Sequence, residues 1–193
     1  MMLRRKKARP GTVLAEAAFI YPVLFLLVLA IILLGLSVFR YQQVAHISRE
    51  ASRWASVHGE QYEKDPLNSD PSKRAATPQD VYDNAIAPFA AGMQTAGTTT
   101  YSVTQDTSAS PPTIAYTGTN QGGITYSITW NMDASGNPDK RPTRTVPVVD
   151  PATGLTKPVA VSNTVTVTVT YTWNTGLFGT LPVSSTSVNT ISY

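Results

Sequence analysis

The chain contains no cysteine and only two histidines, His46 and His58. Without cysteine it can form no disulfide, bind no metal through thiolates and carry no lipid anchor that is attached to a cysteine. Histidine is the commonest general base, so its scarcity leaves few candidates for catalysis. Both histidines follow a long apolar run, where such a residue is more typically solvated or interfacial than catalytic. These absences predict that the protein is not an enzyme.

Charged residues are also scarce, at 14% of the chain, and they are unevenly distributed. The net charge of +3 comes mostly from a short N-terminal arm. The basic residues of this arm are Arg4, Arg5, Lys6, Lys7 and Arg9. Because the positive charge is concentrated there, it does not indicate binding to nucleic acid, and we expect no nucleic-acid partner.

The sequence offers little to hold a cofactor or a metal ion. It contains no Gly-rich phosphate loop followed by Lys-Ser or Lys-Thr. Asp133, Asn137 and Asp139 provide oxygen atoms that calcium could use, but beside Gly136 and Pro138 they are more typical of a turn. We therefore predict no cofactor and no metal site.

An uncharged, mainly apolar run extends from Ala17 to Phe39. As a helix it would be roughly 34 Å long, and the hydrocarbon core of a bilayer is about 30 Å thick. Pro22 and Gly35 lie within the run, and both residue types are commoner in membrane-spanning helices than in soluble ones. The apolar region of a removable secretory signal is shorter, about 7–15 residues. The run therefore predicts a single transmembrane helix.

The charges on either side of the run indicate its orientation. The N-terminal arm holds only basic residues, whereas the other flank carries Arg40, Arg49 and Arg53 together with Glu50. Positive charge is retained on the cytoplasmic side of a membrane, so the N-terminus is expected to be cytoplasmic. The C-terminal part of the chain is then expected to lie outside the cytoplasm.

Glu16 places an acid where the apolar run begins, a short distance after Gly11. One interpretation is that this charge lies near a helix N-terminus, where the macrodipole favours it. Another is that the chain is cut after Gly11, which would free an amine on Thr12 with an ordinary pKa of about 7.7–8.0. Glu16 could pair with that amine within one helix, or with the amine of the next subunit in a helical assembly. Either pairing would lower the cost of holding a charge in lipid.

The order of a basic arm, Gly11, Glu16 and a long apolar helix resembles the class III signal of type IV pilins and pseudopilins. In those proteins a membrane aspartic peptidase, the prepilin peptidase, cuts the chain on the cytoplasmic side. More narrowly, the segments EAAFIYPVL from Glu16 and AHISREASRWA from Ala45 resemble the TadE-like family. That family supplies minor pilins or pseudopilins to the tight-adherence (Flp) pilus machinery. The resemblance covers about residues 4–58.

The resemblance implies a structural protein that is processed between Gly11 and Thr12. Its helix would then insert into a type IV (Tad/Flp-like) pilus or its assembly complex, with Glu16 as the assembly charge. The implied partners are the membrane, prepilin peptidase, and other pilin subunits with their assembly machinery. The implied location is the bacterial inner membrane, with a periplasmic or extracellular head, or the pilus and cell surface. The alternative is an uncut single-span anchor that carries a surface-binding, adhesin-like β-domain.

Helical periodicity continues beyond the apolar run. One apolar face is marked by Val44, Ile47, Ala51, Trp54 and Ala55. Gly59 is a plausible helix stop, so we expect a leader over residues 1–11 and a transmembrane and amphipathic spine helix over 12–58. Residues 59–97 are expected to form a polar loop to residue 76 and a short helix, opened by a capping box of Thr77 and Asp80 and ended by Pro88.

From Thr98 to Tyr193 the period changes to two, which is typical of a β-rich head. Apolar residues alternate with threonine, serine or asparagine over 101–103, 124–130 and 165–173. We also expect a hairpin of 145–149 with 159–161 and an edge strand over 187–192. The predicted fold class is α+β: a long N-terminal transmembrane spine helix and a small antiparallel sheet that covers the outer half of that helix.

Overall fold

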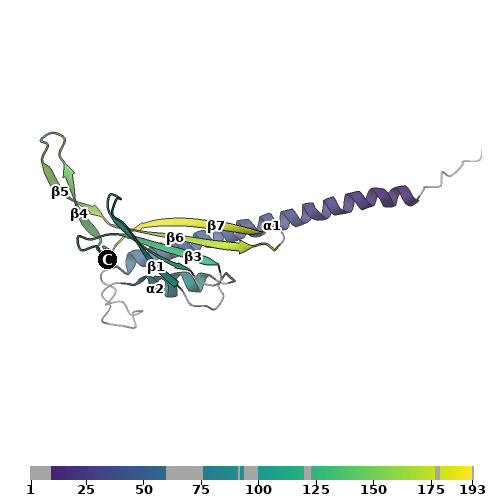
Figure 1. Cartoon of the computed structure of the whole chain (residues 1–193), viewed down its shortest axis with the longest axis horizontal. Coiled ribbons are helices and arrows are strands. Elements are labelled where there is room, and N and C mark those ends of the chain that lie inside the picture. Colours follow the sequence, from purple (N-terminus) through teal and green to yellow (C-terminus); the bar gives the residue numbers. More distant parts are fainter. Residues whose placement is uncertain are drawn as a thin grey trace, which may run out of the picture. The chain divides into compact units, whose positions relative to one another are not determined.

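The computed structural model describes residues 10–59, 76–90, 92–93, 100–119, 123–176 and 179–192. The predicted leader before Pro10 and the predicted loop up to residue 75 lie outside these residues. The chain divides into two compact units, Met1–Arg40 and Tyr41–Tyr193, and helix α1 (Pro10–Val57) belongs to both of them. The two units are described separately below (Figure 1).

In the first unit, α1 is apolar on all sides. Leu14, Phe19 and Ile31 leave 75%, 81% and 60% of their surface exposed. Within the described part of the chain, α1 alone is long and apolar enough to cross a membrane. Pro22 lies inside the helix without ending it. These features are compatible with a single membrane span.

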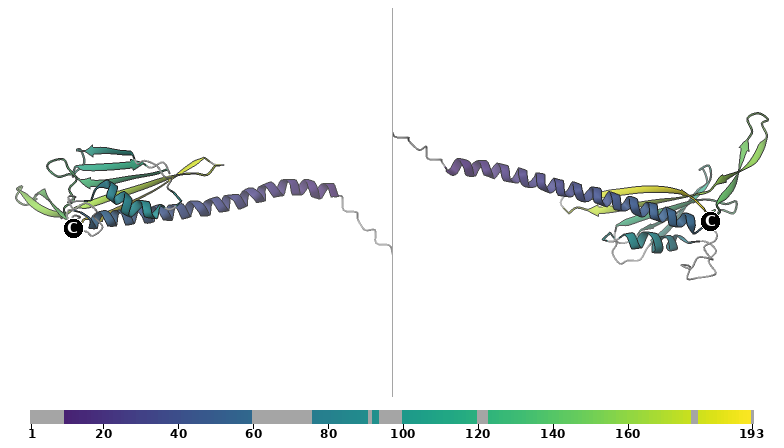
Figure 2. Two further views of the ribbon diagram at one scale, coloured as in Figure 1. Left: turned by 90° about the horizontal axis from the view of Figure 1, so that it is seen from below. Right: turned by 180° about the vertical axis from the view of Figure 1, so that it is seen from behind.

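The second unit contains a five-stranded antiparallel sheet and a separate hairpin. The sheet has the strand order β1-β2-β3-β6-β7, and the hairpin pairs β4 with β5. The bounds are β1 Thr100–Asp106, β2 Thr113–Thr119, β3 Ile124–Asn131, β4 Thr143–Val149, β5 Thr156–Ser162, β6 Thr164–Asn174 and β7 Thr180–Thr190. Figure 2 shows the same elements from two further sides. A long apolar helix with an antiparallel sheet confirms the predicted α+β fold class.

A short helical segment precedes the sheet. It consists of α2 (Pro78–Val81), a π-helical turn (Tyr82–Ile86) and a 3₁₀ turn (Ala87–Phe89). The predicted capping box is confirmed: the Asp80 backbone N–H donates to Thr77 Oγ1 at 3.2 Å, and the Thr77 N–H donates to Asp80 Oδ2 at 2.8 Å. This reciprocal pair satisfies backbone donors that the helix itself cannot.

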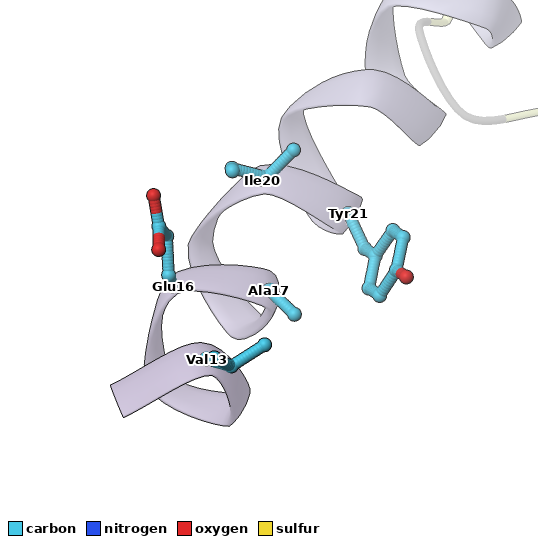
Figure 3. Close-up of a pocket in the computed structure, with 5 residues that line it drawn as sticks. All are labelled: Val13, Glu16, Ala17, Ile20 and Tyr21. Atoms are coloured by element: carbon cyan, nitrogen blue, oxygen red, sulfur yellow. The ribbon is translucent and has the colours of Figure 1, made fainter. Parts of the chain in front are cut away.

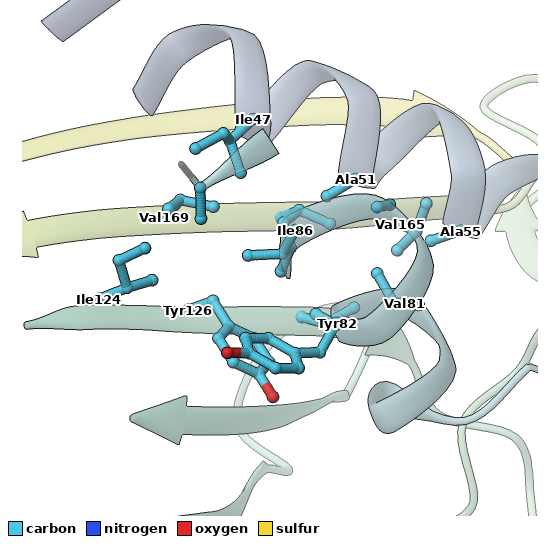
Figure 4. Packing of buried hydrophobic residues seen from close by; sticks show 14 of the residues in the cluster. Ile47, Ala51, Ala55, Val81, Tyr82, Ile86, Ile124, Tyr126, Val165 and Val169 are labelled. Carbon is cyan, nitrogen blue, oxygen red and sulfur yellow. The ribbon is translucent and has the colours of Figure 1, made fainter. Parts of the chain in front are cut away.

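The core lies between one face of the sheet, the second half of α1 and the short helical segment (Figure 4). Val44, Ile47 and Ala51 of α1 are fully buried there. The Tyr82 ring stacks on Tyr126 at 5.0 Å between centroids. Gly118 allows this arrangement, because a Cβ at that position would overlap the Tyr126 ring. The sheet therefore covers the outer half of α1, as the alternating pattern predicted.

The buried stripe of α1 is more polar than the sequence suggested. Trp54 is only partly buried, and its ring stacks on His58 at 4.0 Å. Ser48, Ser52 and Ser56 are buried instead, at four-residue spacing. Ser48 Oγ donates to Ser185 Oγ at 3.0 Å, and Ser52 Oγ donates to Ser187 Oγ at 2.9 Å. Ser48 and Ser52 are tolerated on this face because β7 presents polar partners to them, and the Ser56 hydroxyl donates to the Arg53 carbonyl of its own helix at 2.8 Å.

Several strands differ from the sequence-based expectation. Val103 was grouped with the alternating apolar residues, but it is 55% exposed because β1 is the edge of the sheet. Strand β2 was not predicted. The predicted edge strand over 187–192 is present as β7, which begins earlier, at Thr180, and ends at Thr190. The predicted hairpin is confirmed as β4 and β5.

Candidate functional site

The candidate processing and assembly residues lie in the first turns of α1. The helix begins at Pro10, so Gly11 and Glu16 are on one continuous helix. Proline suits this first position because its fixed φ is already helical and its missing N–H is not needed there. Gly11 and Glu16 are about 7.5 Å apart along the helix axis at the standard rise per residue.

Glu16 brings a carboxylate to an otherwise apolar surface. With Val13, Ala17, Ile20 and Tyr21 it lines a shallow hollow of about 250 Å³ (Figure 3). The Glu16 side chain is exposed, and its carboxylate stands clear of the helix ribbon. Such a group can accept hydrogen bonds from an ammonium group of a neighbouring helix or of its own chain. In the intact chain the Thr12 nitrogen is part of a peptide bond, so the pairing of a free Thr12 amine with Glu16 stays a prediction.

The two glycines of the apolar helix have open space around them. A Cβ added at Gly11 or at Gly35 would meet no described atom within 4 Å, apart from its chain neighbours and the backbone of the adjacent helical turns. Among the described residues, no packing requires glycine at either position. If Gly11 needs to be small, the requirement comes from a molecule that contacts it from outside.

The rest of the apolar run offers a surface without charged groups. Phe19, Ile20, Val23, Leu24 and Leu27 line a shallow apolar groove of about 420 Å³ along the helix. Phe39, at the end of the run, is 57% exposed. A helix with this much open apolar surface needs lipid or other apolar helices around it.

The residues considered for catalysis or calcium binding have local partners. His46 is exposed beside the Phe89 ring, and His58 Nδ1 lies 2.8 Å from the Trp54 carbonyl oxygen. Asp133 Oδ1 accepts hydrogen bonds from the backbone N–H groups of Ser135 and Asn137 at 2.8 Å. Asp139 forms a bidentate ion pair with Arg141 at 2.8 and 2.9 Å. This is turn and ion-pair chemistry, and the described residues contain no cluster of three potential metal ligands.

The described residues contain one exposed apolar helix, which carries a carboxylate near its start, and an antiparallel sheet domain. These features define an α+β protein with one candidate membrane span. The family model described as TadE-like protein matches residues 11–53. This match confirms the resemblance to the TadE-like family and indicates a membrane protein associated with the Tad pilus. No curated protein and no solved structure matches the chain.

Proposed function

We propose that the protein is a minor pilin or pseudopilin of a Tad/Flp-like pilus. It is made with a basic leader, which a prepilin peptidase removes by cutting between Gly11 and Thr12. The exposed apolar part of α1 then holds the subunit in the inner membrane and packs against other pilin subunits in the pilus or its assembly complex. In this proposal the N-terminus starts in the cytoplasm, the head lies outside it, and the role is structural rather than enzymatic.

The family match is the observation that carries this proposal. It begins at residue 11, includes Glu16 and ends at Arg53, so it covers the proposed cut, the assembly charge and the whole apolar run. The structure adds that the large side chains of this run are open and available to pack against lipid or other helices.

Glu16 has a defined role in this proposal. An acid in the middle of a membrane costs about 2.5–3.5 kcal/mol on insertion scales, and less near the interface. A new amine on Thr12, cationic at neutral pH, offsets that cost by pairing with the carboxylate. When the amine belongs to the next subunit, the same pair also sets the axial position of one helix against another.

Processing is tested with matched glycine variants. Gly11→Leu should leave the leader attached, because the peptidase is expected to need a small residue before the cut. Gly35→Leu is the control, since it adds the same bulk to the same helix at a position with equally open surroundings. Intact mass of the membrane-extracted chains distinguishes them. A Gly11→Leu chain that still begins at Thr12 would contradict the role given to Gly11.

Assembly is tested separately through Glu16→Gln. The substitution removes the charge at nearly constant volume, so the helix should still enter the membrane while its pairing with the amine is lost. Co-purification with pilus components should fall while membrane localisation is retained. If the variant co-purifies at the wild-type level, Glu16 acts only as a charge near the helix end. An uncut wild-type chain would instead favour a membrane anchor with a surface-binding β-domain.

A further inference from the structure

The β4–β5 hairpin stands apart from the rest of the second unit. Among the described strands, β4 and β5 pair only with each other, and the hairpin reaches beyond the five-stranded sheet in each view (Figures 1 and 2). An isolated two-stranded hairpin is marginally stable in water and normally needs an apolar surface to pack against. The exposed side chains of the hairpin therefore indicate the chemistry of the surface that it would bind.

One side of the hairpin is a valine face. Direct cross-strand partners and residues two apart share a side, which places Val146, Val148, Val159 and Val161 together. Val148 and Val159 are 44% and 41% exposed. Basic residues border the face at both ends: Arg144 lies opposite Val161, and Lys157 lies opposite Val148.

The base of the hairpin is held by buried polar groups. Asn163 is fully buried; its Nδ2 donates to the Asp139 carbonyl and its backbone N–H donates to the Pro142 carbonyl, each at 2.8 Å. Its Oδ1 accepts from Asn131 Nδ2. Buried polar groups with satisfied hydrogen bonds specify one arrangement. The hairpin is therefore fixed in direction at its base, although its valine face is left open.

We propose that the valine face docks an apolar segment of another protein that carries carboxylates at both of its ends. Arg144 and Lys157 lie at opposite ends of the face, about 13 Å apart at the standard rise of a strand. Arg144 is half-buried at one end of the face and carries a positive charge with which an incoming carboxylate would pair. The Lys157 side chain is 67% exposed and lies 3.3 Å from Asp150, which leaves it accessible to a second carboxylate.

Two other partners fit the hairpin less well: a β-strand added at one of its edges, and a second copy of this chain on the valine face. Pro147 and Pro158 face each other in the middle of the hairpin, and proline has no N–H to donate, so neither outer edge is a good template for an added strand. A second copy packed on the same face with its strands aligned would bring Arg144 against Arg144 and Lys157 against Lys157. This inference does not depend on how the N-terminus is processed.

The test uses the full chain in neutral detergent and two labelled synthetic peptides. Both peptides carry the same core of alternating valine and threonine, flanked at each end by two aspartates in one and two lysines in the other. Fluorescence anisotropy should show at least tenfold tighter binding of the aspartate peptide. Equal binding of the two peptides, or no binding of either, overturns the proposal.

Two adjacent valines provide matched variants. Val148 lies on the valine face and Val149 on the opposite face, and both are exposed. Threonine preserves shape and strand propensity, so Val148→Thr should weaken binding of the aspartate peptide about tenfold while Val149→Thr leaves it unchanged. Equal effects of the two substitutions would contradict the proposal. Self-association of the wild-type chain that Val148→Thr abolishes would assign the face to a second copy and also overturn it.

Discussion

The two halves of α1 differ in how their apolar side chains are distributed and buried, although they form one continuous helix. Up to Arg40 the large side chains point outward on every side, as with Phe19 at 81% exposure. From Val44 onward the apolar residues form a narrow stripe that is buried by the sheet, while Arg49 and Arg53 remain exposed on the other side. The first pattern requires an apolar solvent around the helix, whereas the second requires one partner surface. Apolar residues in the two halves should therefore respond differently to the same substitution.

Truncating a buried isoleucine should have the largest effect on the head. Ile47→Ala removes a side chain that is fully buried, so it should lower the free energy of unfolding of the head by about 2–5 kcal/mol. Ile31→Ala makes the same change in the first half of α1, where the side chain is 60% exposed. Thermal unfolding of the detergent-solubilised chain should show a clear loss only for Ile47→Ala. Equal losses would mean that the two halves do not differ as described.

Matched serines sharpen the comparison with a smaller effect. Ser52 Oγ accepts a hydrogen bond from Asn189 Nδ2 at 2.7 Å, so Ser52→Ala leaves a part-buried donor without that acceptor. We expect a loss of about 1–3 kcal/mol. Ser37 Oγ donates only to the local Leu34 carbonyl at 2.8 Å in the described structure, and Ser37→Ala should leave unfolding of the head unchanged. If Ser52→Ala also leaves the unfolding of the head unchanged, the buried Ser52 hydroxyl contributes no net stability.

The sequence predicted the helical half of the fold better than the sheet. All-round apolarity from Ala17 to Phe39 and the periodic Val44, Ile47 and Ala51 are local signals that a single helix satisfies by itself. The buried serines Ser48 and Ser52 gave no such local signal, because their burial becomes favourable only when a distant strand supplies hydrogen-bond partners. Strand β2 was missed for a related reason: Gly118 interrupts its alternation, and this glycine is explained only by the Tyr126 ring against it.

The candidate functional residues also divide into those that local sequence could predict and those that it could not. Gly11 and Glu16 were selected as candidates because they lie between a basic arm and a long apolar run, and α1 places both within its first turns. The proposed cut at Gly11 and the proposed pairing of Glu16 stay predictions, because the intact chain contains neither a peptidase nor a free Thr12 amine. The basic ends of the valine face could not be foreseen, because Arg144 and Lys157 meet the same face only through the register of β4 against β5. Register depends on pairing across the hairpin, which a linear pattern specifies weakly.

A pH dependence of stability is also predicted within the head. Burial lowers the pKa of Lys140 to about 8, although the nearby Asp80 carboxylate raises it. The unfolded chain, with a lysine pKa of about 10.4, binds more protons between these values, so this group makes the folded state gain stability as pH rises through that window. Lys140→Met removes the effect. The melting temperature of wild type relative to Lys140→Met should rise from pH 8 to pH 10, and a fall would contradict the assigned cause.

The intact mass of the wild-type protein, extracted from membranes of cells that contain a prepilin peptidase, tests the central claim most directly. We predict a chain that begins at Thr12, with the basic arm and Gly11 removed and the apolar half of α1 retained. A chain that keeps residues 1–11, or one cut at a different bond, would contradict the proposal that this protein is a processed subunit of a pilus.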